Sequence, residues 1–189
     1  DFMSLNATPS SERVHIGIFG KRNAGKSSLI NAITGQNLAI VSEAKGTTTD
    51  PVYKAMELLP LGPVMIIDTP GIDDEGVLGS LRIQKAYQVL NKTDIALVII
   101  DAAVGPSAED LRLIERINTK KIPLRIVINK FETINEDKKT AYQALLSNGK
   151  LLFVSAEQKL NIFELKEAIA QTVPADENKA QIVADLLSP

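Results

Sequence analysis

Two glycines, Gly20 and Gly25, enclose the run Lys-Arg-Asn-Ala and are followed at once by Lys26 and Ser27. The apolar run 14–19 just before this segment predicts a buried strand, and the residues directly after it predict a helix. A glycine-rich turn in this place lets backbone N–H groups close around a polyphosphate at the start of the helix. The Lys26 ammonium would contact the outer phosphates, and the Ser27 hydroxyl would coordinate a bound Mg²⁺. The segment therefore restricts the chain to folds in which a strand leads through a phosphate-binding loop into a helix.

Strand and helix patterns alternate along the rest of the chain. Apolar runs predict strands at residues 51–59, 64–67, 95–100, 124–128 and 151–154, and helices at 80–91, 107–118, 136–147 and about 162–173. This alternation favours an α/β fold with a mainly parallel sheet covered by helices on both faces. Ligands of such sheets bind at the carboxyl ends of the strands, so polar motifs that follow strands are the candidate site residues.

Length and composition favour a single domain. With 189 residues, of which 44% are hydrophobic and 23% charged, the chain can bury one good core. We expect residues 13–174 to form this domain. Residues 1–12 would be a polar lead with Met3 as the natural start, preceded by two non-native residues. Residues 175–189 would be a linker stub or a short helix towards domains that this chain lacks.

Charge and cysteine content exclude several function classes. The formal net charge is -2, and no basic excess argues for a nucleic-acid surface. The chain has no cysteine, which excludes disulfides, thiol catalysis and cysteine-ligated clusters. No apolar run is long enough to span a bilayer, and no signal peptide precedes the first strand. We therefore expect a cytoplasmic protein with neither a nucleic acid nor a membrane as partner.

Two further polar segments are candidates for the Mg²⁺ and phosphate site. Asp68 ends an apolar strand and could hold Mg²⁺ through water, and the backbone amide of Gly71 could contact the terminal phosphate. In the run Gly-Thr-Thr-Thr at 46–49, a threonine could close on Mg²⁺ and the γ-phosphate as part of a first switch. We favour Thr48 for this role, with Thr47 as the alternative.

The segment Asn129-Lys130-Phe131-Glu132 resembles the guanine-reading Asn-Lys-x-Asp motif of GTPases. In that motif a carboxylate accepts hydrogen bonds from guanine, whereas Glu132 stands here with one additional methylene. We expect guanine preference to persist, with affinity weakened by about 1–2 kcal/mol, the scale of one imperfect charged hydrogen bond. Ser155 and Ala156 follow the last predicted strand and resemble the element that closes over the guanine base.

These elements, in this order, resemble the Ras-like small GTPase domains, and within them the Era/TrmE branch. That resemblance implies a three-layer domain whose six-stranded, mostly parallel sheet has one antiparallel strand. It also implies a nucleotide-binding set and a catalytic set. The binding set is Asn23, Ala24, Gly25, Lys26, Ser27, Ser28, Asn129, Lys130, Glu132, Ser155 and Ala156, and the catalytic set is Lys26, Thr48, Asn23 and Gly71.

Ile72 follows Asp-Thr-Pro-Gly at the place where Ras-type enzymes carry the glutamine that orients water. In the Era/TrmE branch, the loop asparagine and carbonyls of the first switch bind K⁺ instead. The resemblance therefore implies a K⁺ site at Asn23, Ser42 and Ala44, beside an Mg²⁺ site at Ser27, Thr48 and Asp68. For the acidic run 73–75 we prefer a solvated loop, with one carboxylate that positions water as the alternative.

Two stretches, 47–63 and 68–76, together with the lead at 8–11, closely resemble the GTPases of FeFe-hydrogenase maturation (HydF), from about Met3 to Val173. That family carries a diiron precursor on an iron–sulfur scaffold and delivers it to apo-hydrogenase, with two radical-SAM maturases as further partners. The resemblance implies that this chain is the isolated N-terminal switch domain of such a protein. The full-length protein would dimerise through a domain that is absent here.

The sequence is compatible with three functions. The first is a slow, K⁺-stimulated and Mg²⁺-dependent GTPase that acts as a molecular switch in metallocluster assembly, with residues 36–50 and 72–80 as its moving segments. The second is an RNA- or ribosome-associated assembly GTPase of the Era kind. The third is a passive nucleotide-binding module. The cofactors implied for the first are GTP or GDP, Mg²⁺ and K⁺.

Overall fold

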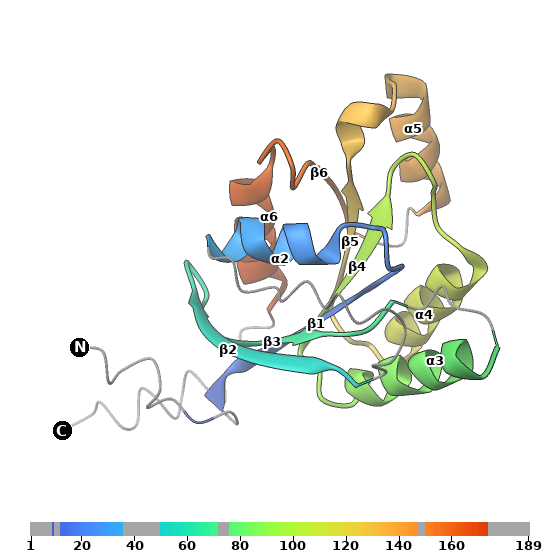
Figure 1. Ribbon diagram of the computed structural model, residues 1–189. Coiled ribbons are helices and arrows are strands. Elements are labelled where there is room, and N and C mark those ends of the chain that lie inside the picture. The colour runs from blue at the N-terminus through green and yellow to red at the C-terminus, as the bar shows by residue number, and fades with distance from the viewer. Residues whose placement is uncertain (1–8, 10–11, 36–49, 72–75, 147–149, 174–189) are drawn as a thin grey trace.

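The computed structural model describes residues 9, 12–35, 50–71, 76–146 and 150–173. Along this part of the chain, strands alternate with helices except at β2 and β3, which follow one another directly (Figure 1). The strands are β1 (Val14–Gly20), β2 (Val52–Leu58), β3 (Gly62–Asp68), β4 (Ile95–Asp101), β5 (Leu124–Asn129) and β6 (Lys150–Val154). The α-helices are α2 (Lys26–Thr34), α3 (Gly76–Leu90), α4 (Ala108–Thr119), α5 (Glu136–Leu145) and α6 (Ile162–Thr172).

The strands form one sheet in the order β2-β3-β1-β4-β5-β6. All neighbouring pairs are parallel except β2 with β3, which form an antiparallel hairpin in which Leu58 pairs with Gly62. The carboxyl ends of β1, β3, β4, β5 and β6 therefore meet at the same edge of the sheet. The predicted fold class, a mostly parallel six-stranded sheet with one antiparallel strand, is confirmed.

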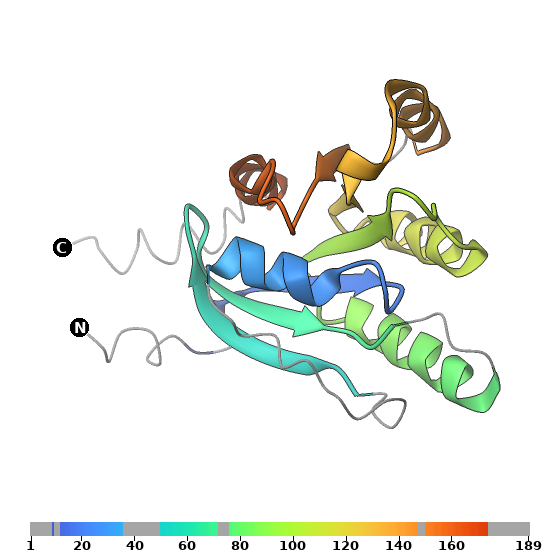
Figure 2. The same ribbon diagram turned by 45° about the horizontal axis from the view of Figure 1, so that its top comes forward.

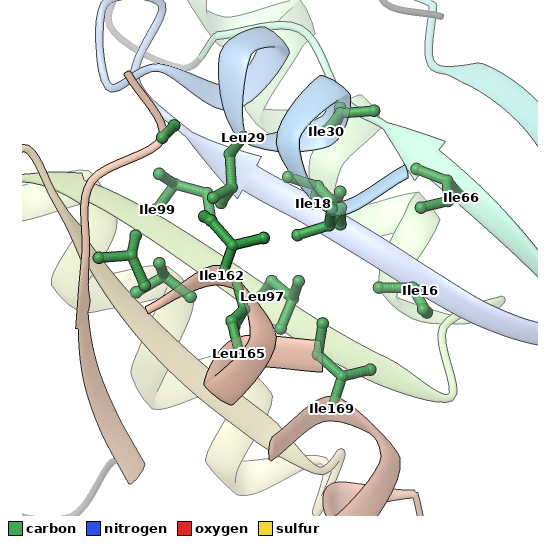
Figure 3. Close-up of a cluster of buried hydrophobic side chains, with 14 of the residues drawn as sticks. Ile16, Ile18, Leu29, Ile30, Ile66, Leu97, Ile99, Ile162, Leu165 and Ile169 are labelled. Carbon is green, nitrogen blue, oxygen red and sulfur yellow. The ribbon is translucent and has the colours of Figure 1, made fainter. Parts of the chain in front are cut away.

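Helices cover both faces of the sheet (Figure 2). α2 and α6 pack on one face, where their apolar side chains meet those of β1, β3 and β4 (Figure 3). The labelled members of this cluster are Ile16, Ile18, Leu29, Ile30, Ile66, Leu97, Ile99, Ile162, Leu165 and Ile169. α3, α4 and α5 contribute to a second cluster, on the other face. β4 is buried along its whole apolar length and contributes side chains to both clusters. Its sequence is therefore one continuous hydrophobic run.

The helix starts follow from side-chain chemistry. The Ser107 hydroxyl accepts a hydrogen bond from Asp110 N, and Asp110 in turn accepts one from Ser107 N, which forms a capping box at the start of α4. Asn135 caps α5 by accepting a hydrogen bond from Lys138 N. α2 begins differently, after a left-handed glycine, and this leaves its first N–H groups available to an anion.

Several element boundaries differ from the sequence predictions, among them those of β3, α3 and β5. β3 begins at Gly62 rather than at residue 64, because Pro63 pairs with Glu57 near the start of the strand, where a missing N–H is tolerated. α3 begins at Gly76, four residues before the predicted start. Asn129 belongs to β5 instead of following it. In the part of the chain that is described, no helix combines the length and the apolar character needed to cross a membrane.

Candidate nucleotide-binding site

The loop between β1 and α2 is shaped by a glycine and a lysine. Gly25 caps α2 in the left-handed conformation, with φ 91°. The Lys26 ammonium folds back over the loop and donates hydrogen bonds to the carbonyl oxygens of Gly20 at 3.1 Å and Lys21 at 3.4 Å. Lys26 is only 6% exposed, so its charge is held inside the loop, where a polyphosphate would lie against the start of α2.

Glycine is required at position 25 for two reasons. A positive φ strains any residue with a Cβ, and a Cβ here would lie 2.3 Å from Asn129 Nδ2. The loop thus approaches the end of β5 so closely that a methyl group does not fit. The prediction that this segment forms a tight turn with its backbone free for phosphate is consistent with that packing.

Asn129 joins two loops that are far apart in sequence. It lies at the end of β5, is 2% exposed, and donates from Nδ2 to the Ala24 carbonyl at 3.0 Å. Its Oδ1 accepts a hydrogen bond from Ala156 N, also at 3.0 Å. One buried side chain thereby fixes the phosphate loop relative to the segment that follows β6.

Lys130 makes a second link to the phosphate loop. Its backbone is left-handed, with φ 62°, and its ammonium donates to the Asn23 carbonyl and to Asp101 Oδ2, both at 3.0 Å. The chain then turns through a short 3₁₀ helix, Phe131–Thr133, on which Glu132 is exposed. The exposed Glu132 carboxylate, three residues beyond the buried Asn129, is available to a base that lies over this edge.

The segment after β6 is a tight turn. Ser155 and Leu160 exchange two backbone hydrogen bonds, and Gln158 N donates to Ser155 Oγ at 3.1 Å. Ser155 is fully buried and Ala156 is 7% exposed. Beyond this turn, a cavity of about 440 Å³ is lined by residues of α2 and of the turn, among them Ser28, Asn31 and Ala156. Its lining runs from Ser28 in the first turn of α2 to Gly35 at the end of that helix, and it borders the turn that the sequence resemblance assigns to the base.

Asp68 ends β3 and pairs with Ile18 in the ladder with β1. Burial raises the pKa of the Asp68 carboxyl, and the charges of Lys26 and Lys54 act in the opposite direction. Thr69 fixes the following turn by donating from its hydroxyl to the Ile18 carbonyl at 2.7 Å. The Asp68 carboxylate and the Ser27 hydroxyl are the oxygen donors that Mg²⁺ prefers, so the described residues fit a magnesium site.

Gly71 touches the phosphate loop. A Cβ on Gly71 would lie 2.6 Å from the backbone N of Arg22, so the segment after β3 packs directly against the loop after β1. The backbone N–H of Gly71 is therefore near the outer end of the loop. This is where the sequence analysis placed the contact with a terminal phosphate.

The structure thus brings most of the predicted residues to one edge of the sheet. Thr48, Ser42 and Ala44, together with the segment 72–75, lie outside the described residues, so the first switch, the carbonyl ligands of K⁺ and the acidic run remain predictions. The Asn23 side chain is exposed at the rim of the loop. Sequence reasoning missed Asp101, which pairs with Lys130, although a carboxylate at the end of an apolar strand was a usable signal.

Comparison with known proteins agrees with this geometry. The family model described as "50S ribosome-binding GTPase" matches residues 15–130. The tRNA modification GTPase MnmE of Acetivibrio thermocellus is 33% identical over 161 residues, which cover 85% of this chain and 34% of that protein. The chain therefore spans about a third of the length of this curated relative.

Solved structures of Era are similar over the same region. A variant of Era from Aquifex aeolicus bound to GDP and AlF4⁻ is 28% identical, with a TM-score of 0.72, and covers 85% of this chain and 56% of that chain. Era in complex with MgGDPNP and nucleotides 1506–1542 of 16S ribosomal RNA is 29% identical, with a TM-score of 0.71, and covers 85% and 57% respectively. The second of these structures contains RNA. The expectation that this chain has no nucleic-acid partner therefore stays a prediction.

Proposed function

The chain belongs to the 50S ribosome-binding GTPase family. From this membership, and from the sequence resemblances described above, we propose that it is a Mg²⁺-dependent, K⁺-stimulated GTPase switch in FeFe-hydrogenase maturation. The family relation supports guanine-nucleotide binding and GTP hydrolysis. The close resemblance of residues 47–63 and 68–76 to the maturation GTPases supports the narrower role.

The observation that carries the nucleotide-binding part of the proposal is the position of Asn129. Its two buried hydrogen bonds join the phosphate loop, at Ala24, to the base-side turn, at Ala156. The order of polar groups along this edge is therefore phosphate loop, Asn-Lys-x-Glu motif and base-closing turn. A nucleotide bound here would touch all three, whereas a free phosphate would need only the first.

The described residues divide the work on GTP. Loop N–H groups at the start of α2 and the Lys26 ammonium bind the phosphates, and they stabilise negative charge that develops during phosphoryl transfer. Ser27 and Asp68 would hold Mg²⁺, which would supply positive charge that neutralises the phosphates. Glu132 accepts hydrogen bonds from the guanine edge. Asn23, on the rim of the loop, would contribute its side-chain oxygen to K⁺.

As a switch in hydrogenase maturation, the protein would hydrolyse GTP slowly. Its functional output would be the change of conformation between the GTP-bound and GDP-bound states. We expect an unassisted rate of about 10⁻⁴ to 10⁻² s⁻¹, as in GTPases that lack a partner-supplied arginine. The partners would be two radical-SAM maturases and apo-hydrogenase. They would act on a full-length protein that dimerises through another domain.

The test is GTP turnover with Mg²⁺ in K⁺ and in Na⁺, with ATP as the control nucleotide. We expect hydrolysis of GTP alone, stimulated about tenfold or more by K⁺, which corresponds to about 1.4 kcal/mol of barrier. Asn23→Ala should lose the stimulation and keep GDP binding, because Lys130 bonds only to its backbone carbonyl. Asn118→Ala, an exposed change on α4, is the matched control. Equal rates in the two salts would refute the K⁺ role.

A second candidate is an RNA-associated assembly GTPase of the Era kind. The favouring observation is the similarity to Era in complex with MgGDPNP and a 16S ribosomal RNA segment. Filter binding of this chain to that RNA segment at two salt concentrations tests it. Affinity that falls steeply with salt and depends on GTP would favour the Era-like role, because phosphate contacts release counterions. No binding at low salt would exclude it for this domain.

A further inference from the structure

A cavity of about 240 Å³ separates the phosphate loop from the connection between β4 and α4. Its lining includes Lys21 and Asn23 from the loop, Gly105 from the connection and Asp110 from the first turn of α4. The volume is enough for several water molecules. The cavity borders the loop that binds the phosphates, and no role in nucleotide binding has been assigned above to Gly105 or Asp110.

Asp110 is the buried acidic residue of this cavity, and only one of its two oxygens is occupied. Asp110 is 1% exposed. Its Oδ2 accepts a hydrogen bond from Ser107 N at 2.9 Å, as part of the capping box of α4. Its Oδ1 has no hydrogen-bond partner among the residues that the structure describes. A buried carboxylate oxygen without a donor is costly, so a donor is expected to reach it in the working protein.

The neighbouring carboxylate shows the contrast. Asp101 lines the same cavity, and both its oxygens are occupied: Oδ1 accepts from Ala103 N at 2.9 Å and Oδ2 from Lys130 Nζ at 3.0 Å. Asp110 therefore stands out as the carboxylate with spare accepting capacity at this position. Burial raises the pKa of its carboxyl, while hydrogen bonds from Ser107 and, at longer range, the charges of Lys21 and Lys26 lower it.

The side chains that hold the phosphate loop in place all bond to its carbonyl groups. Lys130 and Asn129 hold the carbonyls of Asn23 and Ala24, and Lys26 holds those of Gly20 and Lys21. A carboxylate oxygen can instead accept hydrogen bonds from the N–H groups of the loop. Asp110 is thus suited to the donors of the first half of the loop, which faces the same cavity.

On the basis of the proposed function, we propose that Asp110 is a positioning residue of the nucleotide site. Its Oδ1 accepts a hydrogen bond, directly or through one cavity water, from a donor in the Lys21–Asn23 part of the loop. The bond holds the loop in the shape that receives the polyphosphate. Asp110 itself does not touch the nucleotide and acts through the loop. α4 is thereby linked to nucleotide affinity.

The test compares Asp110→Asn with Ser107→Ala in the full chain. Dissociation of a fluorescent GDP analogue is followed by stopped flow, and KM and kcat for GTP are measured with the same proteins. Asp110→Asn cannot present an acceptor to the loop and to Ser107 N at the same time. Ser107→Ala weakens the same helix start but leaves Oδ1 in place, so it is the matched control.

We expect Asp110→Asn to speed GDP dissociation and raise KM about tenfold, as for the loss of one charged hydrogen bond, with kcat nearly unchanged. Ser107→Ala should keep wild-type dissociation and KM. Equal losses in both variants would assign the effect to the start of α4 and overturn the proposal, as would wild-type kinetics in Asp110→Asn. Failure of the wild-type protein to bind the analogue would instead refute the proposed function.

A crystal structure of the wild-type protein with GDP provides a second measurement, in case Asp110→Asn does not fold. We expect Oδ1 within about 3.2 Å of a loop N–H, of Lys21 Nζ or of a water that bridges to one of them. An Oδ1 that contacts only Ser107 or the helix itself would overturn the positioning role.

Discussion

Replacing Asn129 with alanine removes a buried side chain that hydrogen-bonds two loops at once. The truncation leaves the Ala24 carbonyl and the Ala156 N–H without their partner, each at a site where the bond is buried. Each buried polar group that loses its partner costs about 1–3 kcal/mol of unfolding free energy. Losing the partner of both groups would therefore cost about 2–6 kcal/mol. Water that enters the vacated volume recovers part of this. We therefore expect unfolding free energy to fall by about 2–4 kcal/mol.

Thermal and urea unfolding of the nucleotide-free protein measure this loss. For a chain of this size, 1 kcal/mol corresponds to about 2–4 °C, so the midpoint should fall by about 4–16 °C. Asn135→Ala is the matched control, because it also removes an asparagine that accepts from a backbone N–H, but at the exposed start of α5. Loss of that cap should cost about 1 kcal/mol.

The same variant should respond less to ligand. Saturating GDP stabilises the wild-type protein by mass action, and the gain shrinks when the phosphate loop and the base-side turn are no longer joined. An Asn129→Ala protein that is as stable as Asn135→Ala and gains as much from GDP would refute the reasoning. It would show that the two loops hold their places without the asparagine.

Three other changes test separate parts of the site. Glu132→Asp should strengthen GDP binding about tenfold and leave ADP binding unchanged, since one charged hydrogen bond regains its usual length; competition titration measures both. Gly25→Ala should abolish GDP binding, because its Cβ would meet Asn129 Nδ2; calorimetry checks this, and retained affinity would contradict the close packing. Asp68→Asn should lose Mg²⁺-dependent binding. In addition, because burial raises the pKa of Asp68, the nucleotide-free wild-type protein should lose stability as pH rises from the ordinary Asp pKa through the raised one, and the variant should lack this loss in urea unfolding across that range.

The sequence predicts the order of the fold and the phosphate side of the site well, because each signal there is local. A buried strand, a glycine turn and a helix start are contiguous in the phosphate loop, so periodicity and turn chemistry suffice to place Lys26. Asn129 and Asp68 were predicted to be site residues for the same reason, since each stands where an apolar run ends. Such positions meet at one edge of any parallel sheet.

Other features depend on contacts that local patterns do not encode. The pairing of Lys130 with Asp101 joins residues at the ends of two neighbouring strands, and it follows from strand order and register. Asp110 carried a local signal, the Ser-x-x-Asp capping box, but its burial beside the phosphate loop arises only when α4 packs against the sheet. The early start of α3 was hidden by Gly76 and Gly79, because glycines weaken a helix pattern.

The contact between Gly71 and Arg22 transmits pressure from one loop to the other. Because no Cβ fits between them, Gly71 cannot move towards the phosphate loop without displacing it. A partner that pressed the segment after β3 inwards would therefore push on the backbone that holds the phosphates without entering the nucleotide site. In such an arrangement, nucleotide release responds to compression that is applied from outside.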